Sequence, residues 1–205
     1  MKHEWRKAEK KFYMTKTKPE VCPMPAQQFL TIKGQGNPNT SEFAEKVGAL
    51  YTVSYALKMM PRKGIEIEGY YDYTVYPLEG FWTMPDNFTG GKIDKNLLIY
   101  EIMIKQPDFI TEKLVIKAKE LSAKKVTESL LTAMNFKTIH EEQVVQILHK
   151  GSFDEEYLSF EKIAIFCQEN GLSRTDHGHK EIYLSDFRKV TPDKYKTILR
   201  VSVKS

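Results

Sequence analysis

The sequence predicts an α+β fold in which two tandem strand–helix–strand–strand modules form an antiparallel sheet with helices packed on one face. Two observations predict it. The order of periodic segments in residues 26–106 recurs in residues 137–205, and a connecting helix is predicted between them at about 110–123. In each half a glycine turn precedes a helix with a polar N-cap, and two strands follow. We expect a central ligand groove where the halves meet, because such seams are common ligand sites.

The first half contains a strand, a long helix and then extended segments. The strand covers 27–33, and the helix begins at Asn39 or Thr40, which are suitable N-caps, and ends before Pro61. Tyr51 and Tyr55 lie on a helical stripe separate from that of Phe43, Val47 and Leu50. The extended segments are 70–77, 80–83 and 97–105, with a turn at 86–91.

The second half repeats this order. A strand over 144–149 leads to Gly151, and Ser152 with Glu155 forms a capping box for the next helix. The buried stripe predicted for that helix consists of Phe153, Tyr157, Phe160, Ala164 and Cys167. Gly171 ends the helix, and strands over 179–185 and 195–203 complete the half.

Residues 1–25 are predicted to form an N-terminal arm attached to the domain of residues 26–205. Pro19, Pro23 and Pro25 interrupt regular structure in this arm. Its basic residues are broken up by acidic ones, which favours a solvated arm or first helix over a nucleic-acid or membrane contact. The whole chain is balanced in the same way: charged residues make up 28%, yet the net charge is only +4. We therefore expect no direct binding of nucleic acid.

The sequence indicates neither a cofactor nor a metal site. Cys22 and Cys167 are far apart, so no disulfide framework or zinc site is predicted. His177 and His179 lack a third ligand at a defined spacing, and a polar turn is the simpler interpretation. No apolar run is long enough to span a bilayer. The expectation is a cytoplasmic protein with no membrane contact.

Glu181 is the functional candidate that the pattern singles out. The segment 179–184 alternates as a strand, so Glu181 shares a face with Tyr183 and not with Ile182. A carboxylate directed into aromatic surroundings is costly unless something binds it. The alternative is a solvated sheet face beside Lys180, where most strand carboxylates lie.

Four stretches together resemble the GyrI-like small-molecule-binding domain family. They are GQGNP at 34–38, YTVYPLEGFW at 73–82, QILHKGSFD at 146–154 and HKEIYLSD at 179–186. The resemblance covers about 27–203 and implies two modules around a central pocket. It also implies a pocket-facing glutamate on the strand equivalent to 179–184, and Glu181 is the matching residue.

The family resemblance implies several functions. Members include effector domains of multidrug-sensing transcription regulators and freestanding proteins that antagonise gyrase poisons. A freestanding subgroup uses an aromatic cage to hydrolyse the cyclopropane ring of DNA-alkylating natural products. This chain is similar to that subgroup in the segment Lys2 to Lys7, and it departs from the regulators in lacking a helix-turn-helix region. The resemblance therefore implies a hydrolase that gives toxin resistance.

Hydrolysis of such a ligand needs flat apolar walls, a polarised carbonyl and a positioned water. Glu181 is the candidate for orienting or deprotonating the water. Glu101 is a second carboxylate candidate, with a lysine ion pair as the alternative. His149 is a candidate for polarising the carbonyl, with a surface position as the alternative. Candidate walls are Tyr51, Tyr55, Trp82, Phe136, Phe166, Tyr183 and Phe187, although core positions are the favoured interpretation for Phe136 and Phe166.

The sequence thus predicts binding of a hydrophobic, planar aromatic molecule, followed by hydrolysis of a cyclopropane ring. Two alternatives stay open. A non-catalytic module would sequester drugs or cations through Glu181 and aromatic contacts, where a cation over a ring gains about 0.5–2 kcal/mol. A protein-interaction module that blocks a topoisomerase such as gyrase would need an exposed acidic or apolar surface, and the sequence shows none.

Overall fold

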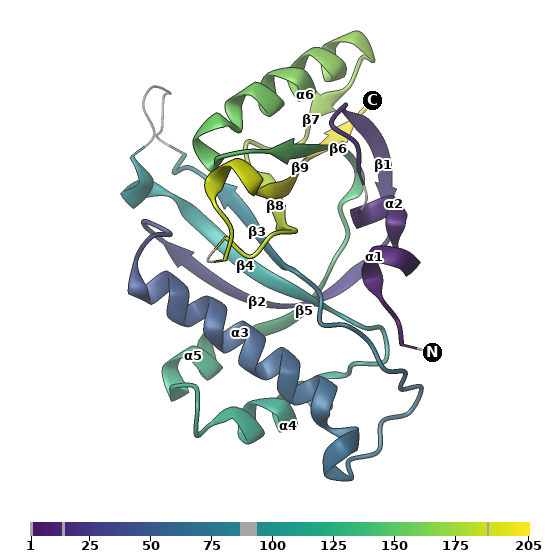
Figure 1. Ribbon diagram of the computed structural model, residues 1–205, viewed down its shortest axis with the longest axis vertical. Coiled ribbons are helices and arrows are strands. Elements are labelled where there is room, and N and C mark those ends of the chain that lie inside the picture. Colours follow the sequence, from purple (N-terminus) through teal and green to yellow (C-terminus); the bar gives the residue numbers. More distant parts are fainter. Residues whose placement is uncertain (1, 14, 87–93, 188) are drawn as a thin grey trace.

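The computed structural model describes residues 2–13, 15–86, 94–187 and 189–205. They form an antiparallel sheet in the order β1-β6-β9-β8-β3-β4-β2-β5, with β7 paired to β9 (Figure 1). The strands are β1 (Glu20–Met24), β2 (Gln27–Gln35), β3 (Leu78–Thr83), β4 (Ile99–Gln106), β5 (Asn135–Ile139), β6 (Glu142–Lys150), β7 (Ser173–Arg174), β8 (His179–Tyr183) and β9 (Lys196–Lys204). Most of the turn predicted at 86–91 lies outside the described residues.

Six α-helices and four short 3-10 helices accompany the sheet in the described residues. The α-helices are α1 (Trp5–Ala8), α2 (Lys10–Tyr13), α3 (Ser41–Met59), α4 (Glu112–Ser122), α5 (Glu128–Ala133) and α6 (Tyr157–Glu169). The 3-10 helices are η1 (Pro61–Lys63), η2 (Lys95–Leu97), η3 (Phe153–Glu155) and η4 (Pro192–Lys194). No helix within the described ranges combines the length and apolar character needed to cross a membrane.

The predicted α+β fold of two modules is confirmed. The first module is β2–α3–β3–β4 and the second is β6–α6–β8–β9, and the two join through the pairing of β3 with β8. Residues 137–139, predicted within the second half, belong instead to β5, which pairs with β2 beyond the first module. The join of β3 and β8 therefore places the seam between the modules at the middle of the sheet.

The two long helices of the modules lie over the same face of the sheet. Antiparallel partners project to the same side, and the register joins one residue from each of six strands into a row: Ile32, Ile102, Gly80, Glu181, Leu199 and Ile147. Helix α3 packs over the Ile32 end of the row, and α6 packs over the Ile147 end. Glu181 is the one charged member, and it lies where α3 gives way to α6.

The N-terminal arm packs on the other face. Strand β1 pairs with β6, and its Pro23 is tolerated because β1 is an edge strand. The Trp5 indole is buried and donates to the Val75 carbonyl oxygen at 3.1 Å, and the buried Arg200 guanidinium donates to the Phe12 carbonyl oxygen. Figure 1 shows α1 and α2 beside the sheet, away from α3 and α6. The arm is thus part of the folded core.

Candidate functional site

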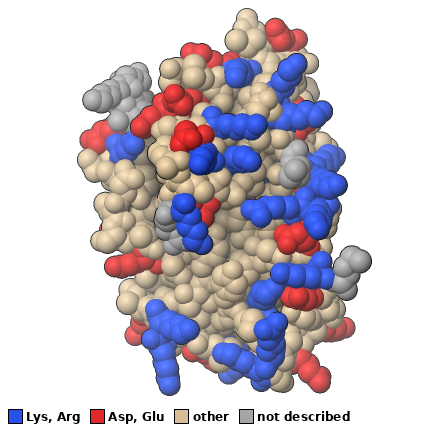
Figure 2. Space-filling model, viewed as in Figure 1, with Lys and Arg blue, Asp and Glu red and all other residues tan. Residues whose placement is uncertain are grey.

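A cleft of about 530 Å³ lies between α3 and the segment that follows β8. Its α3 wall includes Phe43, Tyr51 and Tyr55, and its opposite wall includes Tyr183 and Phe187. Figure 1 shows this segment, in yellow, between α3 and α6, and Figure 2 shows a largely uncharged surface around the centre of the same face. The predicted groove is therefore present, and aromatic side chains form both of its walls.

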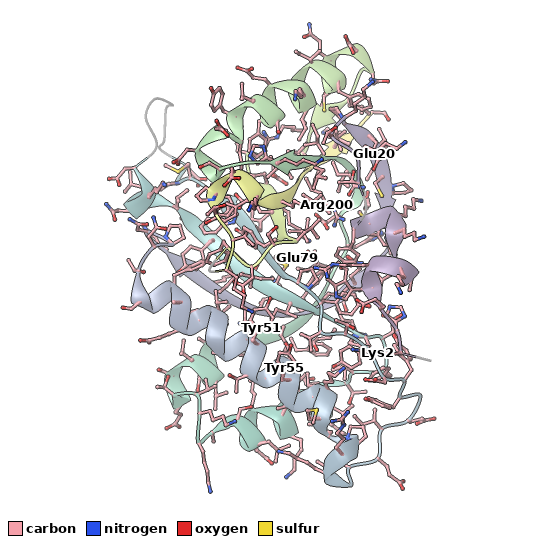
Figure 3. The ribbon with its side chains drawn as sticks, in the orientation of Figure 1. Lys2, Glu20, Tyr51, Tyr55, Glu79 and Arg200 are labelled. Carbon is pink, nitrogen blue, oxygen red and sulfur yellow. The ribbon has the colours of Figure 1, made fainter. Side chains whose placement is uncertain are left out.

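The aromatic walls differ in how firmly they are held. The Tyr51 hydroxyl accepts a hydrogen bond from the Leu78 backbone N–H at 3.1 Å, which ties α3 to the start of β3. The Tyr55 ring lies 6.5 Å from the Tyr51 ring, and Tyr55 is 52% exposed. Figure 3 shows both tyrosines on α3. Tyr55 is the most exposed of the aromatic wall residues, so it offers a ligand the largest fraction of its surface.

A chain of hydrogen bonds leads from Trp82 through Tyr183 to Glu181. The Trp82 Nε1–H donates to the Tyr183 hydroxyl oxygen at 2.9 Å, and the Tyr183 side chain is hydrogen-bonded to Glu181. Burial, followed by the charge and hydrogen bond of Glu181, raises the pKa of Tyr183 well above its usual value. Tyr183 therefore stays a neutral donor. Since it also lines the cleft, it connects the carboxylate to the ligand space.

Gly80 makes room for this chain. It is the register partner of Glu181, and a Cβ placed on it would lie 2.7 Å from Trp82 Nε1 and 3.4 Å from the Tyr183 hydroxyl. Any side chain at position 80 would push the indole away from Tyr183. Gly80 is therefore needed because its lack of a side chain leaves room for the hydrogen bond between Trp82 and Tyr183.

Glu181 is largely buried and has neutral or weakly basic partners. Its side chain is 12% exposed, and its Oε1 lies 2.9 Å from His179 Nε2. No lysine or arginine of the described part of the chain forms an ion pair with it. A buried carboxylate without a strong cation is retained at a cost in stability, which marks the position as a functional candidate.

A second carboxylate lies beside Glu181. Glu156 precedes α6 and is buried, and its carboxylate, the Glu181 carboxylate and the His179 imidazole each place a ligand atom within 4.8 Å of the others. Burial, then the charges of Glu181 and Asp154, raise the pKa of Glu156 to about 10. The site thus brings two buried carboxylates close together, and their mutual repulsion falls when positive charge lies between them.

The structure places two predicted polar site residues, Glu101 and His149, away from the cleft. Glu101 projects from the opposite sheet face and pairs with Lys137 at 2.8 Å, because its strand position has the parity of Phe81 and not of Gly80. His149 is buried, where its imidazole nitrogens lie 3.0 Å from Ser159 Oγ and 3.0 Å from the Ser152 carbonyl oxygen. It is therefore neither at the surface nor free to polarise a ligand carbonyl.

Phe136 and Phe166 are half-buried against the hydrophobic cores, and Trp82 supports a wall without lining it. Phe136 on β5 is the register partner of Leu30 and packs against the larger core. Phe166 packs against the smaller core under α6. Trp82 is 5% exposed and lies behind Phe43, with ring centroids 5.8 Å apart. Tyr51, Tyr55, Tyr183 and Phe187 line the cleft as predicted. Glu181 does not line it and is connected to it through Tyr183.

Sequence reasoning missed Glu156, Phe43 and the contribution of the arm. Trp5 and Arg6 close part of the cleft, and Arg6 Nη2 donates to the Leu184 carbonyl oxygen at 3.2 Å. The buried stripe of α6 was also misplaced: Tyr157 is 59% exposed, whereas Ile163 is buried. Spacing gives a signal for Glu156, because positions 156, 160, 163 and 167 share one helical face.

Together the fold and the cleft define a two-module α+β protein with an aromatic binding site at the seam of its modules. The family model of the GyrI-like small molecule binding domain matches residues 17–204. The chain belongs to this family. Among curated proteins, none matches the chain significantly.

Three solved structures illustrate the similarity. A hydrolase from Listeria innocua is 35% identical, with a TM-score of 0.89 over 98% of this chain and 100% of that one. An uncharacterized conserved protein from Listeria innocua is 36% identical, with a TM-score of 0.91 over 98% of this chain and 100% of that one. The C-terminal domain of EcmrR is 13% identical, with a TM-score of 0.56 over 92% of this chain and 98% of that one, and it shares the fold alone.

Proposed function

We propose that this protein binds a hydrophobic, planar molecule in the aromatic cleft and hydrolyses the cyclopropane ring of DNA-alkylating natural products, giving toxin resistance. The observation behind the proposal is that Glu181 lies at the end of the Trp82–Tyr183 hydrogen-bonded chain, and that Tyr183 in this chain lines the cleft. Further support comes from the similar Listeria innocua protein, which is named a hydrolase.

The proposed reaction adds water to a cyclopropane that is conjugated to a carbonyl. The water oxygen forms a bond to the ring methylene, and the C–C bond between that methylene and the ring carbon conjugated to the carbonyl breaks. Its electron pair moves into the conjugated system and makes the carbonyl oxygen an oxyanion. Glu181 accepts the proton that the water loses, and that proton ends on the oxyanion. Atoms and charge balance without a cofactor.

The cleft supplies the two other requirements of this reaction. Its aromatic walls hold a flat ligand by offset stacking, which contributes about 0.5–1.5 kcal/mol per ring pair. Tyr183 lines the cleft and is hydrogen-bonded to Glu181, so a ligand against Tyr183 lies near the base. Fixed geometry of this kind lowers the barrier, because the water, base and electrophile meet without a further loss of entropy.

A non-catalytic binding module is the second candidate. Two buried carboxylates beside aromatic rings favour a cationic planar ligand, since cation–π contact and charge attraction act together. Such a protein would protect the cell by sequestering the compound.

The test is incubation with a cyclopropane-bearing alkylating agent, followed by mass spectrometry for a product one water heavier. We expect many product molecules per protein and a loss of about 10²–10⁴-fold in kcat for Glu181→Gln, the range typical of a general base. Glu101→Gln is the matched control, since Glu101 lies on the opposite face. Protection at one equivalent without product would support sequestration instead.

A further inference from the structure

The position of Glu156 is set by the turn that begins the second helix. The Ser152 hydroxyl accepts a hydrogen bond from the Asp154 backbone N–H at 3.3 Å, and η3 follows over Phe153–Glu155. Glu156 comes directly after η3 and is 7% exposed, whereas its neighbours Glu155 and Tyr157 are exposed. The turn therefore directs this one acid of the Asp154–Glu156 run toward the sheet.

The Glu156 carboxylate is buried beside another acid and lacks a complete set of partners. Its Oε1 has no hydrogen-bond partner among the described residues, and ligand atoms of Glu156, Glu181 and His179 lie within 4.8 Å of one another. An unsatisfied buried carboxylate oxygen is costly, and two ionised carboxylates at this separation repel each other strongly. Some positive charge must be shared between them.

The groups around the pair do not supply that charge as a fixed cation. On β8, His179 and Tyr183 contact Glu181; on η3, Asp154 pairs with the exposed Lys95 at 3.4 Å. On β6, His149 is bonded to Ser159 and Ser152. Lys180 projects to the other sheet face, where it pairs with Glu141 at 2.8 Å. A proton is the cation that requires no further ligands.

We propose that Glu156 and Glu181 hold one proton between them at neutral pH, with Glu156 as the neutral acid and Glu181 as the carboxylate bonded to Tyr183. Glu156 is the more deeply buried of the two acids. The unequal surroundings make Glu156 the acid that holds the proton and Glu181 the carboxylate that accepts one. Pairs of acids with such different environments recur in active sites. The resulting acid is a donor that keeps Glu181 ionised. Glu156 is thus a positioning residue for Glu181.

The proposal extends the proposed function, but its first test uses no ligand. Side-chain ¹³C-labelled glutamate is followed by NMR from pH 4 to pH 10. We expect one carboxyl signal to keep the chemical shift of a neutral acid at pH 7, and to be absent in Glu156→Gln. Glu155→Gln is the matched control: it removes an adjacent but exposed carboxylate, and we expect the signal to remain.

Two results would overturn the shared proton. One is the absence of any neutral glutamate signal at pH 7 in the folded wild-type protein. The other is one equivalent of a divalent metal in the purified protein, lost in both Glu156→Gln and Glu181→Gln, because a metal ion would then neutralise the pair. Neither measurement requires a ligand or turnover. A failure of the shared proton can therefore be distinguished from a failure of the proposed hydrolysis.

A second test follows the role of Glu156 in turnover. Glu156→Gln retains a neutral hydrogen-bond donor, so we expect its pH profile to follow that of wild type and its loss of kcat to be smaller than that of Glu156→Leu. Glu156→Leu removes the donor, and we expect half-maximal activity to move to higher pH by about one unit. Equal pH profiles for wild type and folded Glu156→Leu would remove Glu156 from the proposed site.

Discussion

Lys180 and Glu181 are neighbours in the sequence, yet they project to opposite faces of β8 and meet opposite environments. On the arm-covered face, Lys180 Nζ lies 2.8 Å from Glu141 and 3.5 Å from Glu79, and it is 3% exposed. Burial raises the pKa of Glu141, but Lys180 and Arg200 outweigh it and hold the value below normal. Glu79 and Arg200, which the strand register places on this face, are labelled in Figure 3. On the helix-covered face, Glu181 and Glu156 have no such partner in the described chain.

The comparison separates two uses of buried charge. The carboxylates of Glu79 and Glu141 on the arm-covered face form ion pairs with a fixed cation, Lys180, so they belong to the architecture of the fold. The carboxylates under the helices depend on a proton and on neutral donors, which leaves them able to exchange a proton with a ligand or water. Which face a charge occupies in this sheet is therefore a guide to its role.

Removing the cation from the arm-covered face tests that division most strongly. In Lys180→Met, Glu141 and Glu79 lose their shared partner, and breaking a buried pair in this way typically costs about 3–5 kcal/mol. We expect that loss in the free energy of urea unfolding. Lys137→Met is the control, since Lys137 is 39% exposed in its pair with Glu101 and exposed pairs contribute at most about 1 kcal/mol. Equal costs would mean that Lys180 is not the partner these acids require.

A methyl group at position 80 tests the other face. In Gly80→Ala the new Cβ would approach Trp82 Nε1 to 2.7 Å, so the indole must leave Tyr183. We expect a destabilisation of about 1–3 kcal/mol from overpacking and a shift in tryptophan fluorescence. Gly48→Ala on α3 is the control: no atom lies within 4 Å of its Cβ, and alanine favours a helix by about 1 kcal/mol. A Gly80→Ala protein with unchanged fluorescence would contradict the hydrogen-bonded chain.

Much of this fold was predictable because it rests on local signals. The caps, glycines and alternating strands located both modules, and the alternation of β8 placed Glu181 beside Tyr183. The same reasoning failed where strand parity depends on a partner: Glu101 shares a strand with Ile102, but only the register with β3 shows that it projects away from the cleft. Parity is local, whereas the choice of the buried face is a tertiary property.

The missed part of the site is formed by distant segments. Glu156 meets Glu181 across 25 positions of sequence, and Trp5 reaches the cleft from the arm. The acidic run at 154–156 resembles the solvated start of any helix, so composition alone does not show that Glu156 is buried. Its spacing to Phe160 and Ile163 indicates a buried position. Acids are mostly exposed, however, so sequence alone does not favour burying one on an apolar stripe while its partner is unknown.

Acid titration sharpens the comparison on the arm side of the sheet. Burial raises the pKa of Glu9, but Lys105, Tyr76 and His3 together lower it. A lowered carboxyl pKa stabilises the fold above the unfolded-state value near 4.5 and is lost as the pH falls through the folded-state value. Lys105 and Glu9 are both largely buried, and Tyr76 and His3 still contact the carboxylate when Lys105 is removed. In Lys105→Met we therefore expect about 1–3 kcal/mol less stability at pH 7 and a shallower loss between pH 5 and pH 3. A parallel displacement of the two stability–pH curves would exclude this pair as an acid-sensitive contact.

Truncation of Tyr55 tests the ligand wall alone. Because Tyr55 is 52% exposed, we expect Tyr55→Ala to change the unfolding free energy by less than about 0.5 kcal/mol, as is usual for surface positions. The loss of one stacking ring should weaken a planar ligand by about 0.5–1.5 kcal/mol, measured by titration calorimetry. Tyr157→Ala is the matched control: Tyr157 is 59% exposed on α6 and does not line the cleft, so its loss should leave affinity unchanged. Equal effects of the two substitutions would mean that binding follows exposed aromatic surface in general, and that the contrast between a ligand face and a structural face does not extend to the α3 wall.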